Sequence, residues 1–344
     1  MTDNIKDFES IMDSMLKCQR GVRWKPSVKH YIIGGVEEAY RQSQALQNGS
    51  WKNSKPNPIT IPYPKRREGL SIPFKDRVYQ RSINDNVLYP VMTKSFIAAN
   101  CACQKGKGTD YARKLVKKYL WRHFRNHGLT GWVLQVDIKS YYPTMRHDAV
   151  YATFKPKLDG EVYASIKDIL ENQSGEEAGF FPGSQMVQIA GISLLDKIDH
   201  HIKERCGIKS YIRYMDDFLL IHESKETLES CLEEIKAELA KIGFKVHPKK
   251  TKIRPLKDGL KFLGFNYKLT ETGKVLMMLD SDNVRHERRK LRRMARKVSK
   301  GEMDKAKVDE CYRSWKAHAA HGTSYKLLQR MDIFYNSLFK EVTA

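Results

Sequence analysis

The segment that most constrains the fold is YIRYMDDFLLIH, residues 211–222, in which two apolar arms flank a pair of aspartates. Two short apolar runs around a polar centre predict a tight β-hairpin with Asp216 and Asp217 at its turn. A second apolar strand, WVLQVDI at residues 132–138, also ends in an acid, Asp137. The alternative is that these acids only form turns, because aspartate is common in tight turns.

Helical patterns stand on both sides of the hairpin. Residues 184–205 place apolar side chains near one helical face, and residues 225–242 do so between Ser224 as N-cap and Gly243 as C-cap. The order of strand, helix, hairpin, helix and further strands predicts an α+β fold. Its antiparallel sheet would have a split-βαβ arrangement with helices on one face. The further strands are expected at residues 261–267 and 275–278.

Such a sheet would bring Asp137 beside Asp216 and Asp217, although a long stretch of chain separates them. Carboxylates crowded in this way repel one another unless a hard cation neutralises them. Mg²⁺ is typically held by a few carboxylates together with substrate phosphates. The pattern therefore predicts two metal ions roughly 3.5–4 Å apart, one activating an attacking hydroxyl and the other stabilising a leaving phosphate.

The charge of the chain indicates a polyanion as partner. The 344 residues include 62 Lys and Arg against 40 Asp and Glu, a formal net charge of +22, and such a surplus is typical of nucleic-acid-binding proteins. A basic structural protein is the alternative on charge alone. No apolar run approaches the ~20 residues of a membrane span, so we expect a cytoplasmic protein without a membrane partner. The cysteines lack the CxxC spacing of a zinc site and are expected to be reduced and structural.

Together, these motifs resemble the reverse transcriptase family. VDIKSYY precedes YMDD in the family's order, and further blocks match from about Ile59 to the C-terminal helices. The resemblance implies a right-hand polymerase with fingers at residues 1–130 and a palm at residues 131–280 that carries the catalytic hairpin and a primer grip. It also implies a helical thumb at residues 281–344, where RHERRKLRRMARKVSK supplies a very basic first helix.

The resemblance also implies a role for each residue of the palm motifs. Asp137, Asp216 and Asp217, with Ile138 beside the first of them, would hold two Mg²⁺ ions, or Mn²⁺ in their place. Tyr142 matches an aromatic steric gate, whose ring excludes a 2′-hydroxyl and so favours deoxynucleotides. The structural alternative for Tyr142 is a core aromatic next to its tyrosine and proline neighbours.

Basic residues in the matching blocks are candidates for contacts with phosphates. Lys250, in PKKTKI, matches the lysine that protonates or screens the departing pyrophosphate; a solvated lysine-rich loop is the alternative. Other candidates are Lys65, Arg66, Arg67 and Arg77 for the triphosphate, Lys105 and Lys107 for template or nucleotide, Phe262, Leu263 and Gly264 for the primer grip, and Arg288, Arg289, Arg292 and Arg293 for the duplex.

One block departs from the common family pattern. Many reverse transcriptases read P-Q-G-x-x-x-S-P before the helix that supports the nucleotide, whereas this chain reads F-F-P-G-S-Q-M-V-Q. Aligning Gly183 with the family glycine puts Pro182 in place of the usual Gln and Gln188 in place of the last Pro. All three are candidate substrate-binding residues. A similar departure occurs in diversity-generating retroelement enzymes, so the block indicates that branch or another bacterial or phage group, such as retron or phage-defence enzymes.

The sequence therefore predicts an RNA-directed DNA polymerase that extends a DNA or RNA primer with deoxynucleoside triphosphates on an RNA template. An RNA polymerase or a template-independent terminal transferase of the same fold stays open. A non-catalytic nucleic-acid-binding scaffold is the other alternative, although the presence of all three acids argues against it. By resemblance only, a structured non-coding RNA and a small accessory protein are expected partners, in a bacterial retroelement or an antiviral defence system.

Overall fold

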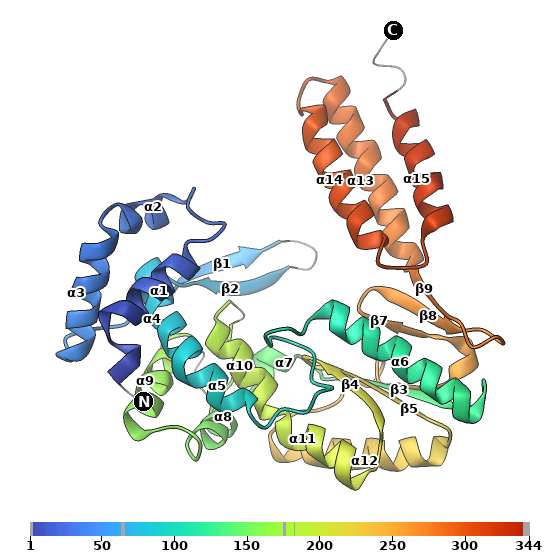
Figure 1. Ribbon diagram of the computed structural model, residues 1–344, viewed down its shortest axis with the longest axis horizontal. Coiled ribbons are helices and arrows are strands. Elements are labelled where there is room, and N and C mark those ends of the chain that lie inside the picture. Colours follow the sequence, from blue (N-terminus) through green and yellow to red (C-terminus); the bar gives the residue numbers. More distant parts are fainter. Residues whose placement is uncertain (1–2, 63–65, 175–176, 182, 340–344) are drawn as a thin grey trace. The chain divides into compact units, whose positions relative to one another are not determined.

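The structure is a computed structural model that describes residues 3–62, 66–174, 177–181 and 183–339 (Figure 1). It combines helices with antiparallel strand pairs, so the α+β class expected from the sequence is confirmed. The chain divides into two compact units. Unit 1 comprises residues 1–112, 135–220 and 229–252, and unit 2 comprises residues 113–134, 221–228 and 253–344. The expected division into fingers, palm and thumb stays a prediction.

Unit 1 begins with helices and a two-stranded ribbon. Asp7 caps the first α-helix by accepting a 2.6 Å hydrogen bond from the Ser10 N–H, and Pro26 occupies the first turn of the second. The elements are η1 (Asp3–Ile5), α1 (Phe8–Cys18), α2 (Pro26–Ile33), α3 (Gly35–Gln47), β1 (Asn57–Ile61), β2 (Arg67–Ser71), α4 (Phe74–Ile83), the π-helix η2 (Asn84–Leu88) and α5 (Tyr89–Thr93).

The ribbon differs from the hairpin expected in this region. In the sequence, short apolar runs at residues 59–61 and 70–72 around a basic, glycine-containing segment predict a hairpin with its turn at residues 65–69. In the structure β2 already begins at Arg67, and Gly69 pairs with Ile59 of β1 inside the strand. Gly69 is buried whereas the other residues of β2 are not, and a glycine inside a strand suits a position where other groups approach the backbone closely. The connection is therefore shorter than expected, and its residues 63–65, including Lys65, lie outside the described part of the chain.

The middle of the chain supplies the sheet at which the aspartates lie. Within the described ranges, four strands pair in the order β4-β5-β3-β6. The elements are α6 (Thr109–His127), β3 (Trp132–Asp137), α7 (Tyr141–Thr144), α8 (His147–Phe154), α9 (Gly160–Glu171), α10 (Gln185–Leu194), α11 (Asp196–His200), the π-helix η3 (His201–Arg205), β4 (Ser210–Tyr214), β5 (Asp217–His222), α12 (Lys225–Lys241) and β6 (Lys252–Pro255).

Two helical predictions in this region have different outcomes. α12 has the expected caps: the Ser224 hydroxyl accepts from the Thr227 N–H at 3.0 Å, and Gly243 ends the segment with φ +84°. The single helix expected at residues 184–205 is instead broken into α10, α11 and η3. α10 is buried on almost all sides, and a Cβ at Gly191 would lie only 3.3 Å from Tyr141. Full burial, rather than one apolar face, explains the even spread of apolar residues in α10.

Unit 2 contains a meander and a helical bundle. β7, β8 and β9 pair antiparallel, with Phe262 opposite Phe265 and Tyr267 opposite Met277. The strand expected at residues 261–267 is thus two strands, because Leu263 and Gly264 form a turn with φ +47° and +82°. The elements are η4 (Leu256–Asp258), β7 (Leu260–Phe262), β8 (Phe265–Leu269), β9 (Val275–Leu279), α13 (Ser281–Ser299), α14 (Lys305–Ala319) and α15 (Tyr325–Ser337).

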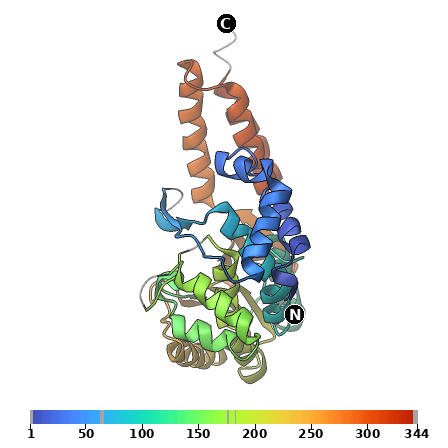
Figure 2. The ribbon, with the colours of Figure 1, turned by 90° about the vertical axis from the view of Figure 1, so that its left-hand side faces the viewer.

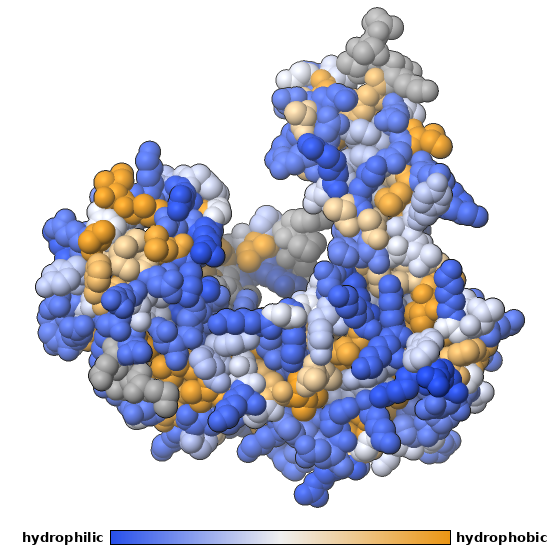
Figure 3. Space-filling view, viewed as in Figure 1, coloured by the Kyte–Doolittle hydropathy of each residue, from blue (hydrophilic) through white to orange (hydrophobic). Residues whose placement is uncertain are grey.

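The three last helices run side by side, as both ribbon views show (Figure 2). Their facing sides are buried, and the rings of Tyr312 and Tyr335 stack with centroids 4.3 Å apart. Most of the surface in view is hydrophilic, in keeping with the charge of the chain, while apolar side chains gather over α2 and α3 (Figure 3). No helix in the described ranges combines the length and apolar character needed to cross a membrane.

Candidate active site

The YMDD segment forms the turn between β4 and β5. Two strands joined by only two residues can pair only antiparallel, so this is the expected hairpin. The turn residues are Met215 and Asp216, whereas Asp217 is the first residue of β5; the expectation that both acids form the turn is corrected by one residue. Met215 has φ +56°, a left-handed conformation that is uncommon for a residue other than glycine. Neighbouring groups must therefore hold the turn in place.

Three carboxylates gather where β5 lies beside β3 in the sheet. Asp137 is the last residue of β3. Desolvation raises the pKa of Asp216, and the charge of Asp137 raises it further. The pKa of Asp217 rises to about 6 through desolvation and the charges of Asp216 and Asp137. The three side chains are therefore close enough to repel one another.

The ammonium group of Lys250 lies beside the carboxylate of Asp137. Its Nζ is 3.0 Å from Oδ2 and 3.1 Å from Oδ1 of that carboxylate. The backbone explains this approach: the His247 N–H donates to the Asp137 carbonyl at 2.7 Å, and Ile138 pairs with Val246 in an antiparallel bridge. The segment PKKT, residues 248–251, is thus held along the end of β3. This position places the Lys250 ammonium group beside Asp137.

The donor set fits hard divalent cations. Carboxylate oxygens are the ligands that Mg²⁺ prefers, and a bound dication would remove the mutual repulsion that raises the pKa values of Asp216 and Asp217. Lys250 contacts both oxygens of Asp137, and the remaining lone pairs of that carboxylate would be available to an ion. Ile138 is buried, and its side chain has no ligand atom, so only its backbone could take part.

The repulsion has a consequence for stability: we expect Asp217→Asn to stabilise the protein without divalent ions above pH 6. The folded-state pKa of about 6 lies above the ordinary 3.8, so the folded protein binds more protons than the unfolded chain between these values, and stability falls as pH rises through this window. The substitution removes that penalty. Because Asp217 is exposed to solvent, which screens its charge, the expected gain is only about 1 kcal/mol, or roughly 2–4 °C in Tm.

Thermal unfolding in EDTA at pH 4 and pH 7.5 measures this effect. The gain should be present at pH 7.5 and small at pH 4, where the folded wild-type protein already carries the proton. Asp148→Asn is the matched control, since a hydrogen bond from Arg146 lowers the pKa of Asp148 and its removal should give no gain. Equal Tm values for the wild type and Asp217→Asn at pH 7.5 would contradict the prediction.

Tyr142 lies at the edge of the carboxylate cluster. It belongs to α7, is half-buried, and meets the Tyr141 ring edge-on with centroids 5.4 Å apart. Desolvation, followed by the neighbouring Cys103 thiol and the Asp216 carboxylate, raises its pKa well above the ordinary value. The neutral ring of Tyr142 thus lies near Asp216. A side chain that excludes a 2′-hydroxyl would have to lie in this position.

Cys103 is a site residue that sequence reasoning missed. Its Sγ lies 3.6 Å from Met215 Sδ and 3.8 Å from Gln188 Oε1, and φ +53° turns its backbone toward them. Gln188, half-buried on α10, is thereby brought to the catalytic turn. No sequence signal could have found this, because C-A-C resembles any pair of structural cysteines.

Two candidates from the departing block have different outcomes. Gly183, at φ +148°, lies close to the Leu70 carbonyl, while Pro182 lies outside the described residues.

The other basic residues expected to contact the triphosphate, template or nucleotide lie in different surroundings. Arg67 lies within electrostatic range of Asp216, and its charge offsets a small part of the rise that burial causes in the pKa of Asp216. Arg66 pairs with Glu68 at 3.7 Å, and Arg77 lies near Cys18 of α1. Lys105 covers the Tyr89 ring at 5.2 Å, and Lys107 donates to the carbonyls of Ile97 and Asn100. Of this group, Arg67 is the residue that the structure brings to the carboxylates.

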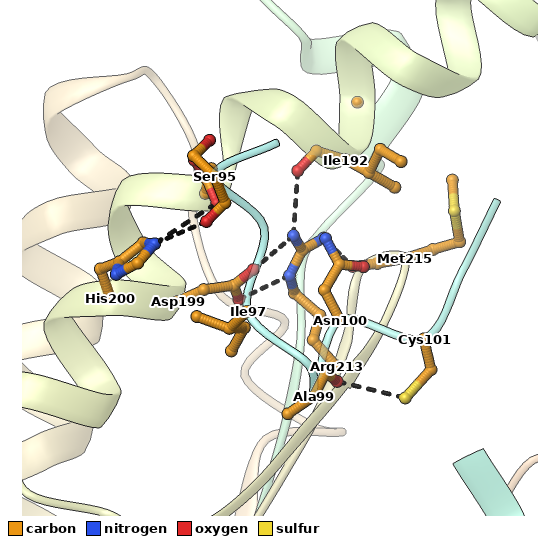
Figure 4. A network of polar contacts seen from close by, with 12 residues as sticks. Ser95, Ile97, Ala99, Asn100, Cys101, Ile192, Asp199, His200, Arg213 and Met215 are labelled. Atoms are coloured by element: carbon orange, nitrogen blue, oxygen red, sulfur yellow. Dashed lines mark hydrogen bonds and ion pairs between the residues drawn. The ribbon is translucent and has the colours of Figure 1, made fainter. Parts of the chain in front are cut away.

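A buried ion pair contacts the turn between β4 and β5 (Figure 4). The Arg213 guanidinium donates to both carboxylate oxygens of Asp199, at 2.7 and 2.6 Å, and both side chains are completely buried. The same guanidinium donates to the Ile192 carbonyl of α10 at 2.9 Å and to the Met215 carbonyl at 3.1 Å. Sequence reasoning missed this pair too. Arg213 therefore holds the backbone of the strained turn that carries Asp216.

The candidates of unit 2 lie on two of its elements. Phe262 is buried, and Leu263 with Gly264 forms the β7–β8 turn. On α13, Arg288 and Arg292 lie over the Phe334 ring, 5.3 and 5.1 Å from its centroid. Arg288 is half-buried there, whereas Arg292 keeps an exposed side despite its contact with the ring, and Arg289 and Arg293 are exposed. The arginine run thus has one side turned to α15 and another turned to solvent.

Residues 64–267, more than half of the chain, match the family described as reverse transcriptase (RNA-dependent DNA polymerase). The chain belongs to the reverse transcriptase family. The resemblance inferred from the motifs is thereby confirmed, and the protein is a nucleotidyltransferase of that family. No curated protein matches the chain.

Solved telomerase structures are similar to this reverse transcriptase in fold. Telomerase from Candida albicans, in complex with a TWJ fragment of telomeric RNA, matches 76% of this chain and 55% of its own, with 12% sequence identity and a TM-score of 0.51. Apo telomerase from Candida tropicalis, truncated from its C-terminal domain, matches 64% of this chain and 54% of its own, with 13% identity and a TM-score of 0.49. The chain spans about half the length of these telomerases. At such identities the likeness shows the fold alone.

Proposed function

We propose that this reverse transcriptase extends a primer on an RNA template by two-metal phosphoryl transfer. The observation that carries the proposal is the cluster of Asp137, Asp216 and Asp217, with Lys250 on one side and Tyr142 on another. Mg²⁺, or Mn²⁺, would supply Lewis-acid charge at the attacking and leaving oxygens. The chain's own residues bind, orient and select the nucleotide.

Each residue of the cluster has a distinct task in this proposal. The three carboxylates hold the cations and so determine where the α-phosphate lies. Lys250, whose ammonium group lies beside Asp137, would neutralise charge on the departing pyrophosphate. Arg67, within range of Asp216, meets the triphosphate of the incoming nucleotide. Tyr142 excludes ribonucleotides.

A primer-extension assay tests the reaction class. The purified protein, Mg²⁺, a labelled primer, an RNA template and deoxynucleoside triphosphates should give full-length complementary product. Products of heterogeneous length, with a composition that does not follow the template, would instead indicate a terminal transferase. Extension with ribonucleotides as the preferred substrates would indicate an RNA polymerase.

The steric gate gives the first prediction from this proposal: Tyr142→Val should admit ribonucleotides. Loss of the ring opens the space that a 2′-hydroxyl requires, so the ratio of kcat/KM for deoxy- over ribonucleotides should fall at least about tenfold. Tyr142→Phe is the matched control, because it keeps the ring and should keep the discrimination. A Tyr142→Val enzyme as selective as the wild type would remove Tyr142 from this role.

The second prediction concerns the basic helix α13, which we propose binds the phosphates of the primer–template duplex. Arg289→Gln with Arg293→Gln should flatten the plot of log affinity against log salt by about two units of slope, since each exposed arginine releases about one counterion on binding a phosphate. Arg288→Gln with Arg292→Gln is the control pair, because these side chains stack on Phe334. Its slope should change less. Equal slopes for the wild type and the exposed pair's variant would mean that α13 does not contact the backbone.

We further propose that the enzyme serves a bacterial retroelement or a phage-defence system, with a structured non-coding RNA and a small accessory protein as partners. Support comes from the F-F-P-G-S-Q-M-V-Q block, which departs from the common reverse transcriptase pattern at Pro182 and Gln188. Sequencing the nucleic acid that copurifies with the protein from its host tests this role. A single structured RNA species supports it, and a random sample of cellular RNA counts against it.

A further inference from the structure

A second group of potential metal ligands lies in unit 1, apart from the catalytic aspartates in sequence. Among the described residues, one set of three brings potential ligand atoms within 4.8 Å of one another: His201, Cys206 and Glu234. His201 begins the π-helix η3, Cys206 follows its end, and Glu234 belongs to α12. No sequence signal marks this set, because the ligands come from two separate elements without metal-site spacing.

The π-helix is what aligns the first two side chains. The Cys206 N–H donates to the His201 carbonyl at 3.1 Å, closing an i→i+5 turn. In a regular α-helix, residues five apart would point about 140° away from each other. The wider π-turn instead lets the imidazole and the thiol face the same neighbour, and π-turns occur frequently at functional sites.

The neighbour is one face of α12. Glu234 Oε2 lies 2.7 Å from His201 Nε2 and 3.6 Å from Cys206 Sγ. Cys231, three residues earlier on the same face, is buried, and its thiol shares a hydrogen bond with the thiol of Cys206. An imidazole, a thiol and a carboxylate thus converge from two elements, and the Cys231 thiol adjoins them through its contact with Cys206.

The distance between the Cys206 sulfur and the Glu234 oxygen is close to that in a tetrahedral zinc site. Zn–S bonds of about 2.3 Å and Zn–O bonds of about 2.0 Å set the sulfur and oxygen ligands roughly 3.5 Å apart, close to the 3.6 Å between Cys206 and Glu234. Zn–N and Zn–O bonds set nitrogen and oxygen roughly 3.3 Å apart. The 2.7 Å contact of His201 with Glu234 is a hydrogen bond that must open by about half an ångström to admit the ion.

We propose that His201, Cys206, Cys231 and Glu234 form a structural Zn²⁺ site. Sulfur and imidazole ligands select a borderline-soft ion such as Zn²⁺ and disfavour Mg²⁺, which requires oxygen. On binding, Zn²⁺ forms four bonds, to one nitrogen, two sulfurs and one oxygen, and the two thiols release their protons to solvent. No electron is transferred, and no co-reactant is needed.

Access and energetics favour loading from solvent. The Glu234 side chain is 45% exposed and that of His201 19% exposed, so the ion can reach the cluster without unfolding of the chain. Burial raises the pKa of both thiols, that of Cys231 far above its usual range. Zinc must therefore displace two protons, and its affinity should increase with pH.

The position of the site indicates what it does. Cys206 lies shortly before β4, and the helix that carries Cys231 and Glu234 follows β5, so the ligands flank the catalytic hairpin on both sides of the sequence. A zinc ion bound here would join the segment that leads into the hairpin to the helix that leads out of it. This is the role of a closed structural site rather than of an open catalytic one.

Cobalt substitution tests the proposal. The reduced full-length protein, freed of metal, is titrated with Co²⁺ and then with Zn²⁺ as competitor. We expect one equivalent of Co²⁺ with a thiolate-to-cobalt charge-transfer band, displaced by one equivalent of Zn²⁺, and a higher Tm with zinc. Glu234→Gln and Cys206→Ala should weaken zinc binding at least about tenfold. Cys311→Ala, a cysteine of α14 outside the cluster, and Asp217→Asn, a catalytic acid, should leave the band unchanged.

Several outcomes would overturn the site. One is the absence of the charge-transfer band at one equivalent of Co²⁺, and another is full binding by Glu234→Gln, whose exposed position keeps the variant folded. A band that disappears in Asp217→Asn would assign the ion to the catalytic acids.

Discussion

Asp216→Asn should lower the rate of nucleotide incorporation roughly a thousandfold or more, with the fold retained. Asp216 stands in the two-residue turn of the hairpin and lies within electrostatic range of Asp137. An amide in its place keeps the shape of the side chain but removes the negative charge that a divalent ion requires. The loss should therefore appear in kcat more than in the affinity for the primer–template.

Single-nucleotide extension at saturating deoxynucleotide measures the effect, with RNA binding followed separately. Asp258→Asn, an exposed acid of η4, is the control and should keep full activity. The Asp216→Asn variant should also keep the wild-type Tm or exceed it, because one of the three repelling charges is gone. Activity of Asp216→Asn within about tenfold of the wild type would show that this acid is not a metal ligand.

Local signals in the sequence were sufficient for the elements that carry the acids. The apolar arms of the YMDD segment and the caps of α12 are short-range features, since a strand pair or a helix end depends on residues a few positions apart. The position of the turn within the segment was wrong by one residue. Met215 adopts a positive φ there, which no propensity favours for methionine. Tertiary contacts decide that register.

Contacts between distant elements could not be predicted in the same way. Arg213 was unremarkable among 62 basic residues, yet it is completely buried because Asp199 faces it from α11. Cys103 approaches the catalytic turn only because the strand-like segment at residues 99–101 pairs beside β4. The change from α11 to the π-helix η3 likewise has no local cause in the sequence, and this change brings His201 and Cys206 together.

Arg213→Met is expected to destabilise the protein by about 3–5 kcal/mol. Methionine fills the space but leaves the Asp199 carboxylate buried with the Tyr211 hydroxyl as its one remaining side-chain donor. Burial would by itself lower the pKa of the Arg213 guanidinium, but Asp199 more than offsets this and raises it, so the arginine is charged in the folded protein. Unfolding in urea, followed by circular dichroism, measures the loss.

The double variant Arg213→Met/Asp199→Asn separates charge from position. With both charges gone, much of the lost stability should return, because replacing a buried pair by neutral groups is often nearly neutral. Asp199→Asn alone should be strongly destabilised, since it leaves the guanidinium unpaired. Additive losses in the two single variants, without recovery in the double variant, would mean that the pair is not coupled.

Activity should not return with stability in the double variant. The Arg213 guanidinium also donates to the Met215 carbonyl at 3.1 Å and so holds the backbone of the turn that carries Asp216. Methionine has no donor for that carbonyl, and a small displacement of a catalytic group lowers rates steeply. We therefore expect a folded double variant whose kcat is reduced about tenfold or more while KM for deoxynucleotide changes less. Arg213→Lys, which keeps a charge and a donor, should keep more activity than Arg213→Met at equal folded fraction. A double variant that is folded and has the wild-type kcat would show that the role of Arg213 is purely structural.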